Sequence, residues 1–294
     1  MNDGQQELVV FIHIPKTGGT TLGNIIDRQY DPKSIFEVYV QRPDTVSEFF
    51  ALSAEKKETI QCLRGHMPFG LHEHFPGRSP LYITMLRDPV SRTLSEYKHI
   101  LSDRERWRSW GPPPTRAESL DDYVSWRMEI GWMNLQTRFI SGYADMGKLN
   151  PPLDSLPEDA LERAKENLSK YFVVVGSLKR FDESVLLMKR HLNWTGSLIS
   201  RRGRLSPRSL PPDTVSSGTL DRIAELNQLD TELVRFGADL LDEQLRRQTG
   251  DFARELSRIS RSNKAVFALQ QLYRHAPKGL QRFLRQHLLN RTPT

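Results

Sequence analysis

The residues that most restrict how this chain can fold stand near its start. There the apolar run Leu8-Val-Val-Phe-Ile12 leads into His13-Ile-Pro-Lys-Thr-Gly-Gly-Thr-Thr21. An uninterrupted β-branched and apolar run is typical of a buried parallel strand, and two adjacent glycines allow a sharp turn after it. We therefore predict a strand over 8–14, a loop, and a helix over 20–29.

The same order of elements recurs twice along the chain. Leu81-Tyr-Ile-Thr-Met-Leu86 ends at Arg87-Asp-Pro89, where Asp88 can cap a helix and Pro89 can occupy its first turn. A third strand is predicted over 171–175, between helices over 157–170 and 182–192. Strands that alternate with helices predict an α/β protein with a three-layer, P-loop-like fold, in which helices flank a central parallel sheet.

The C-terminal part has a different character. Residues 220–247 have helical spacing of apolar positions, and we predict one domain over 1–250 and a basic helical extension over 251–294, interrupted at Pro277-Lys-Gly279. The extension holds nine basic and two acidic residues, so residues 1–250 sum to a net charge of −1. Its basic amphipathic face can lie on an anionic membrane, pack on its own domain, or pair with a second subunit in a homodimer.

Composition excludes several classes of protein. Cys62 is the only cysteine, which excludes an internal disulfide and a cysteine-based metal cluster. The near-neutral main domain does not favour a nucleic-acid partner. Met1 to Glu7 lacks a basic leader, and no apolar run is long enough to span a membrane. We expect a cytoplasmic protein, with the basic extension as its point of contact with the inner face of the membrane.

The first loop has the chemistry of an anion site. Its glycines, Gly18 and Gly19, let backbone N–H groups at the head of a helix point at oxygens, where the helix dipole also favours negative charge. Lys16 adds a full charge, and Thr17, Thr20 and Thr21 add hydroxyl groups. A Walker A loop has its lysine after the second glycine, whereas Lys16 precedes both, so a nucleoside triphosphatase is disfavoured. An ordinary strand-to-helix turn is the alternative.

A second anion contact is predicted at the next strand end. Arg87 offers a forked donor, and Ser95 lies two helical turns along the helix that begins near it. The alternative is a surface arrangement in which Arg87 pairs with Asp88 or Glu96, which contributes little.

Taken together, the two segments resemble a known family. Pro15 to Thr21 is similar to the 5′-phosphosulfate loop of sulfotransferases that use 3′-phosphoadenosine 5′-phosphosulfate, and most similar to the carbohydrate branch that includes heparan sulfate 2-O-sulfotransferase and bacterial family members. Leu86 to Tyr97 resembles that family's second motif, R-D-P-x-x-R-x-x-S-x-Y. The resemblance, which covers about residues 8–245, implies that 15–21, Arg87 and Ser95 hold the donor. It also implies that Lys16 acts on the leaving oxygen.

The transfer needs a general base near the acceptor hydroxyl, and histidine suits because its pKa lies near neutral. Arg64-Gly-His-Met-Pro-Phe-Gly-Leu-His-Glu-His74 offers three histidines. The resemblance assigns the base to His66, in a Gly-His step. His72 and His74 alternate as on the face of a strand, so the three histidines could also be read as metal ligands. No metal is expected, and a surface role for His66 is the third reading.

Other matches to the family are looser. Asn134-Leu-Gln-Thr-Arg138 resembles a polar stretch of the bacterial members that can border the site, and a buried helical face explains it equally well. The arginines at 201, 204 and 208 fall where relatives carry a loop over the donor, and we expect one of them, Arg204 in first place, to contact donor or acceptor. A solvated charge run is the alternative.

The predicted function is transfer of a sulfuryl group from 3′-phosphoadenosine 5′-phosphosulfate to a hydroxyl of a carbohydrate or glycolipid. Golgi members of the family have a membrane anchor and disulfides. This sequence shows neither, which favours a bacterial cytoplasmic enzyme and leaves the acceptor unnamed. Two alternatives stay open: a nucleoside or small-molecule kinase with a divergent phosphate loop, and a non-catalytic binder of anionic glycans or lipids.

Overall fold

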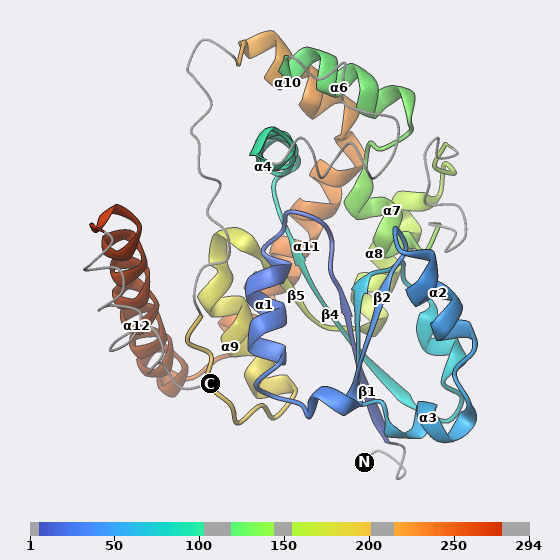
Figure 1. Cartoon of the computed structure of the whole chain (residues 1–294), viewed down its shortest axis with the longest axis vertical. Helices are drawn as coiled ribbons and strands as arrows, with labels where there is room; N and C mark the ends of the chain where they lie inside the picture. The colour runs from blue at the N-terminus through green and yellow to red at the C-terminus, as the bar shows by residue number, and fades with distance from the viewer. Residues whose placement is uncertain (1–5, 103–118, 144–154, 201–214, 278–294) are drawn as a thin grey trace.

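A computed structural model describes residues 6–102, 119–143, 155–200 and 215–277 of the chain (Figure 1). Its centre is a five-stranded sheet in the order β2-β3-β1-β4-β5, in which every pair of neighbours is parallel. The strands are β1 Glu7–Ile12, β2 Ile35–Tyr39, β3 Cys62–His66, β4 Ser79–Leu86 and β5 Phe172–Ser177. The predicted α/β class with a central parallel sheet is confirmed.

Strand β1 lies in the middle of the sheet and pairs with β3 on one side and β4 on the other. Ile12, its last residue, is in register with Gly65 of β3 and Thr84 of β4. The carboxyl ends of these three strands therefore meet at one edge of the sheet. That edge carries His66, Arg87 and the loop after β1 that contains Lys16, Gly18 and Gly19, here called the glycine loop.

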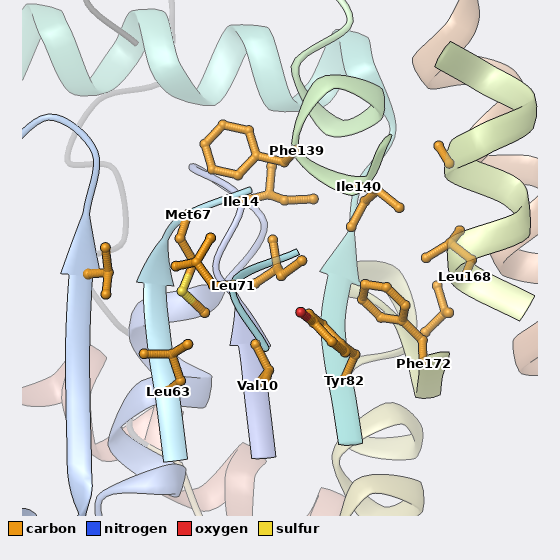
Figure 2. Packing of buried hydrophobic residues seen from close by; sticks show 14 of the residues in the cluster. Val10, Ile14, Leu63, Met67, Leu71, Tyr82, Phe139, Ile140, Leu168 and Phe172 are labelled. Carbon is orange, nitrogen blue, oxygen red and sulfur yellow. The ribbon is translucent and has the colours of Figure 1, made fainter. Parts of the chain in front are cut away.

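One face of the sheet is covered by α2 (Pro43–Phe50), α7 (Leu135–Ser141) and α8 (Ala160–Tyr171). Figure 2 shows how side chains of β1, β3 and β4 meet those of α7 and α8 in this layer. The cluster is almost entirely closed to solvent, and its members include Val10, Leu63, Tyr82, Phe139 and Leu168. Burial of so much apolar surface, at roughly 25 cal/mol per Å², is what fixes these helices on the sheet.

The opposite face is covered by α1 (Gly19–Ile26), α9 (Phe181–His191) and α12 (Gly250–His275). Beside β5, α11 (Gln228–Arg246) contributes Leu233 to the first layer's cluster and Leu241 to the second. The molecule is thus a helix, sheet, helix sandwich, the predicted three layers.

A third, smaller cluster lies beyond the carboxyl ends of the strands (Figure 1). It joins α4 (Pro89–Ser102), α6 (Leu120–Glu129) and α10 (Ser217–Leu226) through buried side chains that include Tyr97, Tyr123 and Ile223. The short elements α3 (Ala54–Thr59), η1 (Pro32–Ser34), η2 (Leu71–His74) and η4 (Leu178–Arg180) complete the described part.

The helical spacing over 220–247 is confirmed, but it is divided between two helices, α10 and α11, because the wholly buried Asn227 leaves the helical path. The Asn227 side chain accepts from the backbone N–H of Asn134, the residue before α7. One local prediction was wrong. His72 and His74 do not alternate on a strand. They belong to the 3-10 helix η2, which begins after Gly70 in a left-handed conformation (φ 113°).

The C-terminal helix α12 packs on α9. Its Phe252 and Ile259 are part of the second apolar cluster, and Ser260 and Asn263 both donate to the Asp182 carboxylate at the start of α9. The division of the chain at residue 250 stays a prediction. No helix in the described ranges is long and apolar enough to cross a bilayer. Arg201, Arg204 and Arg208 lie outside the described residues, as does the extension from residue 278 onward.

Candidate active site

The glycine loop makes a tight left-handed turn between β1 and α1. Lys16 has a φ of 70° and Gly18 a φ of 93°, and α1 begins at Gly19. The first N–H groups of a helix have no partner within the helix, so this turn presents donors at the edge of the sheet. A non-glycine residue held at positive φ, as Lys16 is, costs free energy and tends to occur at functional sites.

Thr17 is committed to the loop itself. Its hydroxyl donates to the Ile14 carbonyl at 2.8 Å, and the side chain is wholly buried. The hydroxyl proton is therefore used to hold the turn, and any contact of Thr17 with an anion falls to its backbone N–H. Thr20 is exposed at the mouth of the loop, whereas Pro15 and Thr21 are half-buried.

Gly19 is required by a histidine that the sequence analysis did not single out. A Cβ at this position would lie 1.8 Å from the His13 ring. The His13 ring stacks on Phe11, with centroids 5.5 Å apart, and meets the His66 ring edge-on at 4.5 Å. Burial, and then the nearby charges of His66, Arg64 and Lys16, hold the pKa of His13 well below its usual range. His13 is thus a neutral wall beside the predicted base.

Arg87 reaches across to the glycine loop. Its Nη1 donates to the Lys16 carbonyl at 3.0 Å, which joins the two predicted anion contacts at the neighbouring ends of β1 and β4. The predicted cap is confirmed, since Asp88 Oδ1 accepts from the Ser91 N–H at 2.7 Å. Ser95 lies half-buried on α4, and helix geometry puts it about 9 Å along the axis from Pro89.

His66 stands at the end of β3, next to β1. The preceding Gly65 has a φ of 147°, and a Cβ there would lie 1.8 Å from the Val38 carbonyl oxygen, so the Gly-His step fits only because residue 65 lacks a side chain. His66 Nδ1 lies 3.3 Å from Gln41 Oε1. With that amide oxygen as acceptor, Nδ1 carries the proton and Nε2 keeps its lone pair. Burial, opposed by Glu96 and reinforced by Lys16, lowers the pKa of His66 to about 4.

Several positively charged side chains lie close to the glycine loop. Glu96 of α4 accepts from Arg92 at 3.1 Å and from Arg127 of α6, and all three side chains are buried. Burial alone would raise the pKa of the Glu96 carboxyl, but Arg127 and Arg92 outweigh it and hold the pKa below its usual value. Burial, opposed by Glu96 and reinforced by Arg87, lowers the pKa of Lys16. One carboxylate thus faces several cations, an arrangement suited to a polyanion.

A groove of about 170 Å³ opens between α1 and the strands β2 and β3. Two of its walls, His13 and Tyr39, are the rings that contact His66, with Tyr39 at 5.2 Å between centroids. Its floor is polar, because Arg64 pairs there with Glu37 at 2.6 Å and Asp27 at 2.7 Å. A hydroxyl-bearing molecule in this groove would lie against the rings that flank His66.

The other histidines have local partners. His72 Nδ1 lies 2.7 Å from the Tyr82 hydroxyl, and the exposed His74 ring lies 5.3 Å from the rings of Phe49 and Phe50. Neither contacts His66. Sequence reasoning missed His13, Glu96 as a buried ion-pair partner, Arg127 and Asp230. Only His13 had a signal, since it opens the glycine-loop segment.

Comparison with known proteins finds a family that is similar to the segment that carries this site. The model of the sulfotransferase family matches residues 3–129. Heparan-sulfate 6-O-sulfotransferase 2 of Gallus gallus is 27% identical over 278 residues, which covers 80% of this chain and 66% of the relative. The protein of that name from Homo sapiens is 28% identical over 277 residues, covering 80% of this chain and 44% of the relative. The chain therefore spans from under half to about two thirds of these relatives' length.

Two solved structures are similar in outline. Mouse sulfotransferase SULT7A1 complexed with PAP covers 94% of this chain and 91% of its own, with a TM-score of 0.40 and 13% identity. A sulfotransferase from Alicyclobacillus acidocaldarius covers 84% and 99%, with a TM-score of 0.41 and 13% identity. Residues 3–129, which match the model of the sulfotransferase family, contain the glycine loop, His66 and Arg87.

Proposed function

We propose that the protein transfers a sulfuryl group from 3′-phosphoadenosine 5′-phosphosulfate to a hydroxyl of a carbohydrate. The observation that carries the proposal is the hydrogen bond of Arg87 Nη1 to the Lys16 carbonyl, 3.0 Å long. It brings a forked cation beside a loop of backbone donors, as a nucleotide with phosphates at both its 3′ and 5′ positions requires. The family match of residues 3–129 supports the same reaction class.

The proposed donor fits the groups that are present. Lys16, the N–H groups at the start of α1 and the guanidinium of Arg87 are donors without acceptor character, and Ser95 adds a hydroxyl on the first turns of α4. In this proposal residues 15–21 hold the 5′ end and Arg87 with Ser95 holds the 3′-phosphate. Arg204 stays a proposed further contact.

The transfer is an in-line displacement at sulfur. The acceptor oxygen forms a bond to sulfur while the bond from sulfur to the 5′-phosphate oxygen breaks, and the leaving phosphate keeps the electron pair. His66 Nε2 takes the acceptor proton, and Lys16 stabilises the charge that develops on the leaving oxygen. Burial of the two side chains favours these roles. It keeps the His66 imidazole neutral and so able to accept a proton, and it strengthens the attraction of the Lys16 cation for an anion.

The proposed acceptor is a carbohydrate that enters by the groove beside His66. Two observations support this: the curated relatives are heparan-sulfate sulfotransferases, and the groove is lined by hydrogen-bonding side chains and the Tyr39 ring. We propose that residues 104–118 and 140–157 select which sugar and which hydroxyl react.

The test is titration calorimetry of the full chain with 3′-phosphoadenosine 5′-phosphate, followed by assay of its release from the sulfated donor against a panel of oligosaccharides. Lys16→Ala and His66→Ala should lower kcat by about 10²- to 10⁴-fold in folded protein, and Arg87→Ala should mainly weaken nucleotide binding. Wild-type activity in His66→Ala would remove that residue from the mechanism. Absence of nucleotide binding in the wild type would reject the proposal.

Melting temperatures measured with different nucleotides distinguish the kinase alternative from the sulfotransferase. A ligand that binds the folded protein and not the unfolded chain raises the melting temperature, and the shift grows with the ratio of ligand concentration to dissociation constant. Stabilisation by ATP with Mg²⁺, without stabilisation by 3′-phosphoadenosine 5′-phosphate, would favour the kinase.

For the basic extension we keep the proposal of contact with an anionic membrane. Its support is composition alone, nine basic against two acidic residues over 251–294. Failure of full-length protein to sediment with vesicles of anionic lipid at low salt would reject it, and analytical ultracentrifugation would report a homodimer.

A further inference from the structure

The backbone of Arg87 is held by a side chain from another part of the chain. Gln136 of α7 accepts from the Arg87 N–H at 3.0 Å through Oε1 and donates to the Arg87 carbonyl at 2.8 Å through Nε2. Arg87 is the first residue after β4, whose pairing with β5 ends at Leu86. The Gln136 side chain therefore takes the place of β5 as the hydrogen-bond partner of the backbone at Arg87.

Gln136 is itself fixed from behind by a buried carboxylate. Asp230 of α11 accepts from the Gln136 backbone N–H at 3.1 Å and from its Nε2 at 3.4 Å. Its other oxygen accepts from Thr137 N at 2.8 Å and Thr137 Oγ1 at 2.9 Å. Gln136, Thr137 and Asp230 are wholly buried. The charge of Asp230 thus lies at the N-terminus of α7, where the free N–H groups and the dipole of the helix stabilise an anion.

The two helices cap each other. Asn134, which precedes α7, accepts from the Asp230 N–H at 3.1 Å, while Asn227, which precedes α11, accepts from the Asn134 N–H at 3.0 Å. Helix α11 also packs along β5 and α8. The chain of contacts therefore runs from the rigid body of the sheet, through two facing helix ends, to the peptide units on either side of Arg87.

We propose that Gln136, held in place by Asp230, is a positioning residue that sets the selectivity of the site for a 3′-phosphorylated nucleotide. In this proposal it acts through Arg87, without contact to donor or acceptor. It fixes the Arg87 backbone, and with it the direction in which the guanidinium leaves the end of β4 toward the glycine loop. The proposal rests on the proposed function, in which Arg87 receives the 3′-phosphate.

The experiment compares two nucleotides that differ only in that phosphate. Dissociation constants of 3′-phosphoadenosine 5′-phosphate and adenosine 5′-phosphate are measured by calorimetry on the full chain, for wild type, Gln136→Met, Gln244→Met and Arg87→Ala. The selectivity is the dissociation constant of adenosine 5′-phosphate divided by that of 3′-phosphoadenosine 5′-phosphate. Gln136→Met keeps the side-chain length and removes both bonds to Arg87. Gln244→Met is the matched control, since Gln244 of α11 also donates to a backbone carbonyl, that of Val173 at 2.8 Å, but on β5.

We expect Gln136→Met to lower the ratio by about tenfold or more, as loss of one charge-assisted contact would, and to approach the ratio of Arg87→Ala. Gln244→Met should keep the wild-type ratio. A role in folding alone would weaken the binding of both nucleotides equally and leave the ratio unchanged, which would overturn the inference.

If Gln136→Met does not fold, the Thr137→Val variant tests the proposal instead. It removes one hydrogen bond to Asp230 and should lower the ratio about two- to threefold. An unchanged ratio would overturn the proposal. A wild type that does not prefer the 3′-phosphorylated nucleotide would instead reject the proposed function.

Discussion

At the scale of single residues, the enclosure of His66 decides the pH range in which it can serve as the proposed general base. Its ring lies between His13 and Tyr39, and burial lowers its pKa to about 4 from a usual value near 6.5. A general base works only when unprotonated. His66 is therefore ready to accept a proton throughout the physiological range, and the cost of this readiness is a weaker base.

The pH profile of kcat/KM tests this, because that quantity follows ionisations of the free enzyme. We expect activity to fall on the acid side with a midpoint near pH 4, since the neutral imidazole is lost only as the pH drops through the lowered pKa. Circular dichroism over the same range separates loss of the base from acid unfolding. A midpoint near 6.5 in folded protein would contradict the lowered pKa.

Gly19 makes a second prediction at this scale. Gly19→Ala would bring a methyl group within 1.8 Å of the His13 ring, and overpacking of this kind costs about 1–3 kcal/mol. We expect the variant to unfold at lower denaturant concentration and to bind 3′-phosphoadenosine 5′-phosphate more weakly. Gly250→Ala is the control, because a Cβ there meets nothing within 4 Å. Equal loss in both variants would mean that the His13 contact is not the cause.

At the scale of elements, the joint between α4 and α6 depends on one carboxylate. Glu96 is shared by Arg92 and Arg127, and its removal leaves two buried guanidinium groups without a counter-charge. Breaking a buried pair in this way costs about 3–5 kcal/mol, whereas an exposed pair contributes about 1 kcal/mol or less.

Glu96→Gln should therefore lower the free energy of unfolding by several kcal/mol, on the order of that 3–5 kcal/mol range, as measured by urea denaturation. Glu243→Gln, which removes an exposed i, i+4 pair with Arg247 on α11, is the matched control and should change stability by less than about 0.5 kcal/mol. Similar losses in the two variants would show that burial of the Glu96 pair has no special weight.

Elements with a strong local signal were predictable, and those defined by tertiary contacts were not. The apolar runs that became β1, β4 and β5 stand out in the sequence, as does the Asp88-Pro89 start of α4. Strands β2 and β3 carry Glu37 and Arg64 on one face, because a polar groove rather than a helix covers that part of the sheet. Because their composition is mixed, these two strands were not predicted from the sequence. The position of His66 beside β1 could therefore not be predicted either.

The candidate site divides in the same way. Lys16, Arg87 and the glycines follow from local motifs, and the sheet brings them together as expected. Gln136 lay in a stretch predicted only to border the site, and Asp230 had no signal, since an acidic residue at a helix start is usually a solvated cap. Gln136 bonds to Arg87 across 49 residues of sequence, and Asp230 bonds to Gln136 across 94.

At the scale of the whole molecule, the packing of α12 concerns whether the predicted extension is separate from the main domain. Phe252 and Ile259 belong to the cluster that covers one face of the sheet, and Lys189 of α9 pairs with Glu255. The beginning of the predicted extension thus shares a core with the residues before it, although the boundary at 250 remains a prediction.

Phe252→Ala should destabilise the protein by about 3–5 kcal/mol, because the side chain is 6% exposed and its loss opens a cavity. Leu272→Ala, on the same helix and 63% exposed, should stay within about 0.5 kcal/mol of the wild type. Thermal and urea unfolding measure both. A negligible effect of Phe252→Ala would favour an independent extension.

Lys16, Arg92 and Arg127 lie near Glu96, and Arg87 lies near Lys16 and Arg92, a crowding of cations with a consequence for the lifetime of the protein. Mutual repulsion among enclosed cations is relieved when a polyanion enters, so transient openings of this region should become rarer as the nucleotide supply rises. Proteases cleave such openings. We therefore expect the protein to have a longer half-life under limited digestion with 3′-phosphoadenosine 5′-phosphosulfate, the proposed donor, than without it.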